Sequence, residues 1–181
     1  MKMSSDNLRL LVPILSLLLL LAGVFYLQPR AMSYMGLNLL FNLAVPIALA
    51  TIAQMLIMSV NDLDLSMGTF VSFVACVTAT YLHDTPVLGS LILLAAIAVY
   101  AVMGVVIHLR NLPSIVVTLG MSFIWAGLAV LLLPAPGGTA PVWIRSLMTS
   151  KPPMVPMAII ASAIIAVVAH VIVMRSSFGV L

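Results

Sequence analysis

Charged side chains are scarce in this 181-residue sequence, which holds only seven Lys and Arg and four Asp and Glu. They make up 6% of the chain, whereas hydrophobic residues make up 64%. A water-soluble domain carries about a quarter charged residues, because its surface has to stay hydrated. The composition therefore excludes an ordinary soluble domain and predicts that membrane lipid surrounds most of the chain.

Cysteine is nearly absent as well, since the chain contains one, Cys76, inside an apolar run. Neither a disulfide framework nor a cysteine metal site can form from it within one chain, and we expect it to pack as a small apolar residue. The basic residues stand singly at the ends of apolar runs, so the net charge of +3 forms no patch that could follow a phosphate backbone. Nucleic acid is therefore not an expected partner.

Long apolar segments make up the rest of the sequence. A helix of about 20 residues spans the hydrocarbon core of about 30 Å, and backbone in lipid has to satisfy its own hydrogen bonds. We therefore predict that residues 1–181 form a single transmembrane domain, all-α, with about six transmembrane helices and a short or broken third helix. The predicted segments are 10–26, 37–60, 67–82, 87–109, 115–133 and 155–174.

The basic residues also predict an orientation. With the N-terminus in the cytoplasm, two arginines directly at helix ends, Arg110 and Arg175, fall on the cytoplasmic side, where the positive-inside rule applies most strongly. The complete grouping places Lys2, Arg9, Arg110 and Arg175 inside and Arg30, Arg145 and Lys151 outside. The margin of four against three makes this a narrow preference.

A proline-rich stretch, 134–153, separates the last two predicted helices. Its prolines predict that no regular helix forms there, and Trp143 is a residue type that suits the boundary between membrane and water. We expect an interfacial loop on the outer surface. Docking of a partner protein on this loop is the alternative.

The densest polar cluster outside the termini and this loop is 61–68, and it contains Asp62 and Asp64. The following segment, 67–82, would rise only about 24 Å as a helix, which predicts that it begins below the membrane surface. We expect Asp64 or Ser66 to cap this helix by accepting N–H groups of its first turn. Non-helical backbone at membrane depth has to lie against protein or a solvated path, so Asp62, Asp64, Ser66 and Gly68 are predicted to line a translocation pathway or gate.

An equally weighted alternative is a tight cytoplasmic hairpin whose two carboxylates are simply solvated. A metal site is not expected, because two carboxylates without a nearby histidine or further acid supply too few ligands. His83 and Asp84 are adjacent at a predicted outer turn, where a solvated pair is expected rather than an acid–base pair.

Three segments resemble the ribose-type ABC permease family. Residues 63–69, Leu-Asp-Leu-Ser-Met-Gly-Thr, are similar to its Ile-Asp-Leu-Ser-Val-Gly-Ser signature. Residues 112–120 are similar to its Ile-Pro-x-x-Ile-Val-Thr-Leu-Gly segment, and residues 175–179 to the Arg-x-x-Phe-Gly that opens its cytoplasmic coupling loop. Departures include Asn61 and Asp62, which stand where the family commonly has two glycines.

The resemblance implies a permease subunit of an ABC importer for a sugar or sugar-like solute, in the bacterial inner membrane. It adds Thr118 and Gly120 to the pathway residues and assigns Arg175, Phe178 and Gly179 to coupling with the ATPase. The implied partners are an ATP-binding subunit, a solute-binding protein outside the membrane and a second permease subunit, besides membrane lipid.

The chain itself is not expected to be an enzyme or to bind a cofactor, because no glycine-rich loop ending in Gly-Lys occurs and ATP would be used by the partner. Family members continue past the coupling loop, so this sequence is expected to be the N-terminal part of such a permease. Two alternatives stay open: a secondary transporter or channel subunit, and a non-functional permease fragment. An intramembrane enzyme is disfavoured, since neither His-Glu-x-x-His nor Gly-x-Ser-x-Gly is present.

Overall fold

A computed structural model describes residues 5–149 and 157–175 of the chain. Within these ranges the regular structure is entirely helical, which confirms the all-α prediction. Each of the predicted apolar segments corresponds to one helix of 18 to 26 residues. The elements are α1 Ser5–Leu27, the 3₁₀ helix η1 Pro29–Met32, α2 Tyr34–Ser59, α3 Met67–Asp84, α4 Pro86–Arg110, α5 Ser114–Leu132, α6 Val142–Thr149 and α7 Met157–Arg175.

Three of the described helices, α2, α4 and α5, are long and apolar enough to cross a membrane. The described apolar parts of α1 and α7 are shorter, at Leu11–Leu27 and Ile159–Ala169. Large apolar side chains such as Leu19, Ile47 and Val116 are more than half exposed, as expected for helices that face lipid. The structure thus fits a membrane protein, and the predicted number of about six spans is not confirmed.

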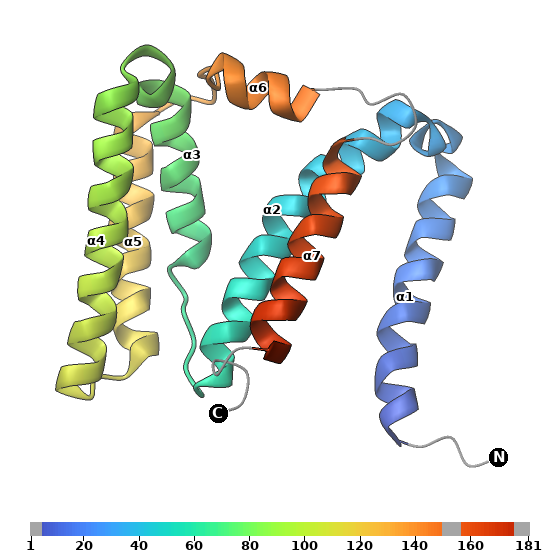
Figure 1. Cartoon of the computed structure of the whole chain (residues 1–181), viewed down its shortest axis with the longest axis horizontal. Helices are drawn as coiled ribbons and strands as arrows, with labels where there is room; N and C mark the ends of the chain where they lie inside the picture. The colour runs from blue at the N-terminus through green and yellow to red at the C-terminus, as the bar shows by residue number, and fades with distance from the viewer. Residues whose placement is uncertain (1–4, 150–156, 176–181) are drawn as a thin grey trace.

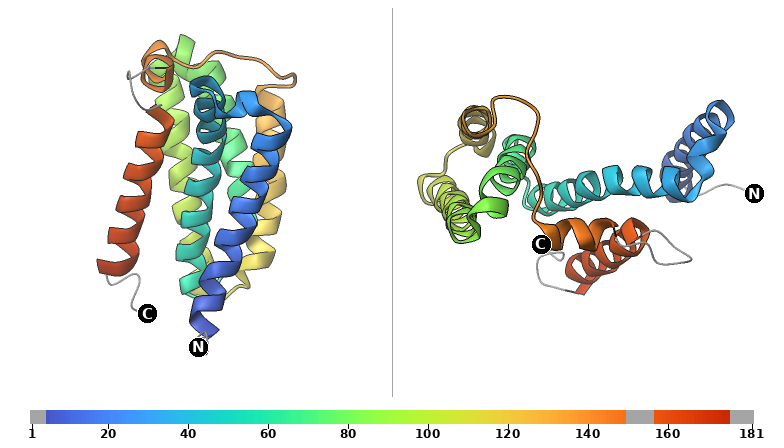
Figure 2. Two further views of the ribbon diagram at one scale, coloured as in Figure 1. Left: turned by 90° about the vertical axis from the view of Figure 1, so that its right-hand side faces the viewer. Right: turned by 90° about the horizontal axis from the view of Figure 1, so that it is seen from above.

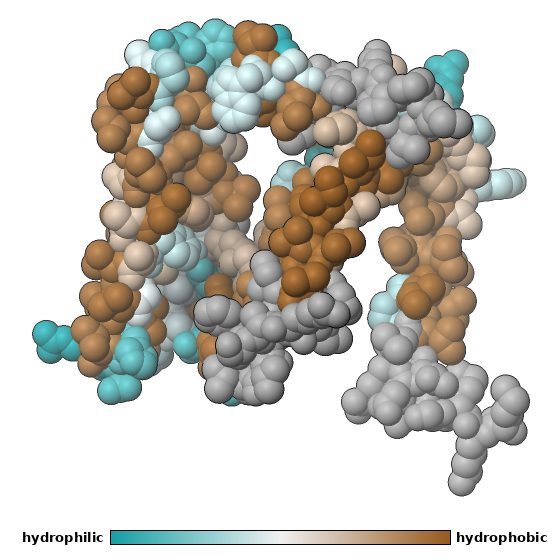
Figure 3. Space-filling model, viewed as in Figure 1, coloured by the Kyte–Doolittle hydropathy of each residue, from teal (hydrophilic) through white to brown (hydrophobic). Residues whose placement is uncertain are grey.

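The helices form two packed groups (Figure 1). α3 packs against α4 and α5, and these three helices are called the α3–α5 group. The hydrophobic core of this group contains Phe73, Val77, Ala96, Trp125 and Ala129. α2 packs along α7, while α1 contacts η1 and stands apart from the other helices (Figure 2). Hydrophobic residues cover the sides of the helices, and hydrophilic residues gather at the two ends of the α3–α5 group (Figure 3).

Successive long helices run in alternating directions, so the polar connections lie at two opposite ends (Figure 1). α4 ends at Arg110 and α7 ends at Arg175, both at the end where α1 begins. Arg30 in η1 and Arg145 in α6 lie at the other end. The described basic residues therefore divide between the two ends as the sequence predicted.

The prediction that no regular helix forms in 134–153 is wrong for α6, Val142–Thr149. Pro141 directly precedes the helix, a place where proline needs no N–H of its own, and the next prolines follow its end. The Pro141 carbonyl accepts the first helical bond from Arg145 at 2.9 Å. Before α6, the Thr139 N–H donates to the Ala79 carbonyl at 3.2 Å and ties the loop to α3.

Candidate functional site

The site begins where the chain leaves α2. Asn61 has a left-handed backbone with φ 60°, its N–H donates to the Met58 carbonyl at 3.0 Å, and the Asp62 N–H donates to the Ile57 carbonyl at 3.3 Å. This pattern is the Schellman ending, in which glycine is the commonest left-handed residue and asparagine a frequent substitute. Asn61 therefore meets the backbone requirement of one of the two glycines that the resemblance led us to expect.

Residues 63–65 then run without helical hydrogen bonds, and side chains of two helices bond to their backbone. The Leu63 N–H donates to Ser114 Oγ at 3.5 Å, and the Leu65 N–H donates to Thr118 Oγ1 at 3.1 Å, both on α5. Between them, the Gln54 side-chain amide of α2, oriented to satisfy both partners, donates to the Asp64 carbonyl at 3.2 Å and accepts from the Asp64 N–H at 3.3 Å. Protein groups thus replace the water that an exposed loop would use.

The Asp64 carboxylate is the centre of a buried polar network. Asp64 is only 8% exposed. Its Oδ1 accepts hydrogen bonds from both the N–H and the hydroxyl of Ser66, each at 2.7 Å. The Tyr100 hydroxyl of α4 donates to Asp64 Oδ2 and lies 2.8 Å from Ser66 Oγ. Ser66 is completely buried. The carboxylate therefore joins the start of α3 to α4.

The prediction that Asp64 or Ser66 accepts N–H groups of the first turn of α3 is wrong. Ser66 precedes α3 with helical backbone angles, φ −90° and ψ −11°, and its side chain makes no capping bond. Its hydroxyl donates to Asp64 instead, and the Asp64 carboxylate accepts from Ser66, not from the first turn of α3. This contact, from a side chain to the N–H two residues on, is an Asx turn that shapes the segment before the helix.

The segment reaches the interior of the α3–α5 group. Tyr100 stands ten residues before the end of α4, which corresponds to about 15 Å along the helix axis. Figure 1 shows the same relation, with α3 beginning partway along α4 and α5. Asp64 is therefore not a solvated carboxylate of a surface hairpin. Asp62, which is half-buried, accepts from Ser114 Oγ at 2.8 Å.

An aromatic group lies beside this network. Phe70 is 4.6 Å from Tyr100 and 5.1 Å from Trp125 between ring centroids, and Phe73 is 5.0 Å from Trp125. These rings pack α3, α4 and α5 together next to the carboxylate. The hydrogen-bond donors to the Asp64 carboxylate come from Ser66 and from Tyr100, whose ring belongs to this aromatic group.

The other predicted pathway residues have different surroundings. Thr118 is 2% exposed and belongs to the network, whereas Gly68 is exposed in the first turn of α3. Gly68 lines an open groove of about 400 Å³ between α2 and α3, together with Thr51, Gln54 and mainly apolar side chains. Gly120 is exposed on α5 and takes no part in the described network.

The predicted coupling residues are mostly beyond what the structure describes. Arg175 is the last residue of α7, at the same end as Arg110. Phe178 and Gly179 lie outside the described residues. Their predicted coupling role stays a prediction.

The sequence did not predict three members of the network, Gln54, Tyr100 and Ser114. Gln54 and Tyr100 are polar residues inside apolar segments, and such residues usually face other protein groups or a cavity. Ser114 lies one helical turn before Thr118 and therefore on the same face of α5. These signals could have selected the residues but not the partners that they contact.

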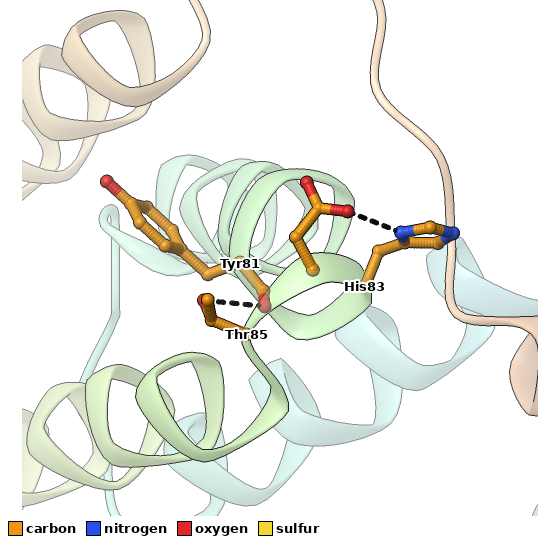
Figure 4. A network of polar contacts seen from close by, with 4 residues as sticks. Tyr81, His83 and Thr85 are labelled. Atoms are coloured by element: carbon orange, nitrogen blue, oxygen red, sulfur yellow. Dashed lines mark hydrogen bonds and ion pairs between the residues drawn. The ribbon is translucent and has the colours of Figure 1, made fainter.

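His83 and Asp84 lie at the end of α3, away from this network (Figure 4). His83 Nδ1 is 2.8 Å from Asp84 Oδ1, and the two side chains are 37% and 78% exposed. The Thr85 hydroxyl donates to the Tyr81 carbonyl at 3.2 Å and closes the turn. The geometry fits the predicted solvated pair. In the described part of the chain, no three His, Cys, Asp or Glu side chains are grouped as a metal site.

Comparisons of the chain with protein-family models, curated proteins and solved structures found no match.

Proposed function

We propose that the chain is a permease subunit of an ABC importer, which moves a sugar or sugar-like solute across the bacterial inner membrane. The observation that carries this proposal is the interrupted passage from α2 to α3, where non-helical backbone lies inside a helix group and polar side chains hold it. In transporters, irregular backbone at membrane depth occurs where it is buried in protein or lines a solute path.

Two sets of residues have different roles in this proposal. Asp64, Ser66, Tyr100 and Thr118 are buried or part-buried and fix the position at which α3 begins. Gly68 lines the neighbouring groove between α2 and α3, which meets the network at Gln54. The groove, at about 400 Å³, falls within the range of about 300–1,000 Å³ that is usual for small-molecule sites.

The groove has few polar groups, and the two side chains that provide them are already engaged. Gln54 binds the Asp64 backbone, and the Thr51 hydroxyl donates to the Ile47 carbonyl at 2.8 Å. A passing solute would therefore be held weakly, as transport requires. Under this proposal the solute-binding protein supplies specificity, and a second permease subunit closes the open side of the groove.

Non-helical backbone at membrane depth also occurs in secondary transporters, so the choice of an ABC importer rests on sequence resemblance. The three similar segments occur in the family's order and extend from residue 63 to residue 179. Under this proposal the ATP-binding subunit contacts the end of the molecule where α7 terminates at Arg175. The solute-binding protein then contacts the opposite end, near α6.

Uptake measurements in the organism that encodes the chain test the transporter class. The reading frame is disrupted, and uptake of radiolabelled ribose, xylose and galactose is measured with and without an expressed copy. We expect disruption to abolish uptake of at least one sugar, with the activity sensitive to arsenate and resistant to a protonophore. Unchanged uptake of all three sugars would contradict the proposal, and uptake abolished by the protonophore alone would favour a secondary transporter.

A further inference from the structure

The short helix α6 has an amphipathic sequence. At 100° per residue, Trp143, Ile144, Leu147 and Met148 fall within one arc, while Arg145, Ser146 and Thr149 fall on the other side with Val142. A helix that packed wholly inside protein would be apolar all round, and a solvated one would be polar all round. The pattern of α6 suits a boundary between an apolar and a polar medium.

The position of α6 agrees with that pattern. It lies crosswise to the long helices and at the level of their ends in Figure 1, and the side view in Figure 2 shows it at the same level. Two of these long helices, α4 and α5, are long and apolar enough to cross a membrane, so their ends would lie near its surfaces. A helix at this level and in this direction would lie in the plane of the lipid headgroups.

The protein leaves much of the apolar arc uncovered. Trp143 is 64% exposed and Leu147 is 49% exposed, whereas Ile144 is partly buried. Contiguous exposed apolar surface is unfavourable in water, and the indole ring of tryptophan is strongly enriched at headgroup level. The bond from Thr139 to Ala79 also ties the chain just before α6 to α3, so the helix stays close to the bundle end.

We propose that α6 binds the phospholipid interface, with Trp143 and Leu147 placed among the upper acyl chains and Arg145 and Ser146 directed toward water. The helix then acts as a lateral anchor that sets the depth of the α3–α5 group in the bilayer. This inference depends on membrane insertion alone and not on transport of a sugar.

The two tryptophans of the chain provide the test, because Trp125 is 3% exposed inside the helix group. The full chain is reconstituted in phosphatidylcholine vesicles that carry bromine either near the headgroup or near the ends of the acyl chains. Trp125→Phe leaves Trp143 as the sole fluorophore, and Trp143→Phe is the matched control that leaves Trp125. If Trp125→Phe impairs folding, the difference between the unmodified chain and Trp143→Phe gives the same signal.

We expect Trp143 to be quenched about twofold more by bromine near the headgroup than by bromine near the chain ends, and to be shielded from aqueous iodide. Trp125 should respond little to any of the three quenchers. Quenching of Trp143 by iodide without quenching by bromolipid would place α6 in water or in the reach of a soluble partner and overturn the inference. Equal quenching at both depths, or none at all, would overturn it too.

Discussion

Asp64 is only 8% exposed, and a buried carboxyl group is stable only with hydrogen-bond partners around it. Ser66 supplies two donors and Tyr100 a third. The contact with Tyr100 links residues 36 positions apart, so the carboxylate fixes tertiary structure as well as the local turn. Charge-assisted hydrogen bonds are roughly twice as strong as neutral ones, which suits this role.

Replacement of Asp64 by Ala should therefore destabilise the fold. The donors of Ser66 and Tyr100 lose their acceptor, and each unsatisfied buried group costs about 1–3 kcal/mol. The midpoint of thermal unfolding in detergent, followed by circular dichroism, measures the effect. The matched control is Asp84→Ala, since Asp84 is largely exposed and contacts only His83 among the hydrogen bonds found.

We expect the midpoint to fall for Asp64→Ala and to stay within error for Asp84→Ala. Tyr100→Phe should give an intermediate loss, because it removes one donor and keeps the contact of the ring with Phe70. Equal midpoints for the two aspartate variants would show that the buried network contributes nothing to stability.

At the scale of elements, α3 and α4 form a hairpin whose turn is unusually close. A Cβ atom on Gly89 would lie 2.8 Å from the Leu82 backbone nitrogen, nearer than carbon atoms approach without displacement. The obstructing atoms are backbone, so they cannot move aside as a flexible side chain can. Gly89 thus allows the start of α4 to pack directly on the end of α3.

Gly89→Ala should open this hairpin and destabilise the protein by about 1–3 kcal/mol. Gly104→Ala, in the same helix, is the matched control, because a Cβ there meets no atom within 4 Å. Removal of a mid-helix glycine should leave stability unchanged or raise it by up to about 1 kcal/mol. Denaturant titration in detergent compares the two, and a larger loss for Gly104→Ala would refute the close-packing explanation.

The segment between α2 and α3 depends on α5 for its backbone hydrogen bonds. Thr118→Val keeps the shape of the side chain but removes the oxygen that accepts from the Leu65 N–H. We expect hydrogen exchange at Leu65 to accelerate roughly tenfold, the effect of losing about 1.4 kcal/mol of protection. Mass spectrometry of the peptide that covers 61–66 measures this rate.

Thr51→Val is the control for that experiment, since the Thr51 hydroxyl bonds only within its own helix, to Ile47. Its exchange profile over 61–66 should match that of the unmodified chain. If Thr118→Val left the Leu65 exchange rate unchanged, the segment would not depend on α5 for its order.

At the scale of the whole molecule, composition and the lengths of apolar runs were enough to predict helices and most of their limits. Proline position was misjudged at α6, where a helix fits between Pro141 and the prolines that follow. The grouping of helices could not be predicted, because α2, α4 and α7 carry too few polar residues to form a polar face that reveals which side packs.

The sequence predicted some residues of the candidate site but not the contacts between them. Asp64 and Ser66 stood out because they interrupt an apolar sequence. Their contacts with Tyr100 and Thr118 depend on how α4 and α5 pack, and nothing in the local sequence around residues 61–68 specifies that packing. The role of Gln54 likewise follows only from the position of α2 beside the segment.

In the proposed permease, α3 begins beside an aqueous route, and Gly68 faces that route. In the full chain with Cys76→Ala, single cysteines are introduced by Gly68→Cys and by Val102→Cys, the latter 61% exposed and directed to the opposite side of α4 from Tyr100. Labelling by a charged, membrane-impermeant methanethiosulfonate, which reacts in water, is then measured in vesicles. The account predicts rapid labelling at position 68 and almost none at 102, whereas equally slow labelling at both positions would contradict it.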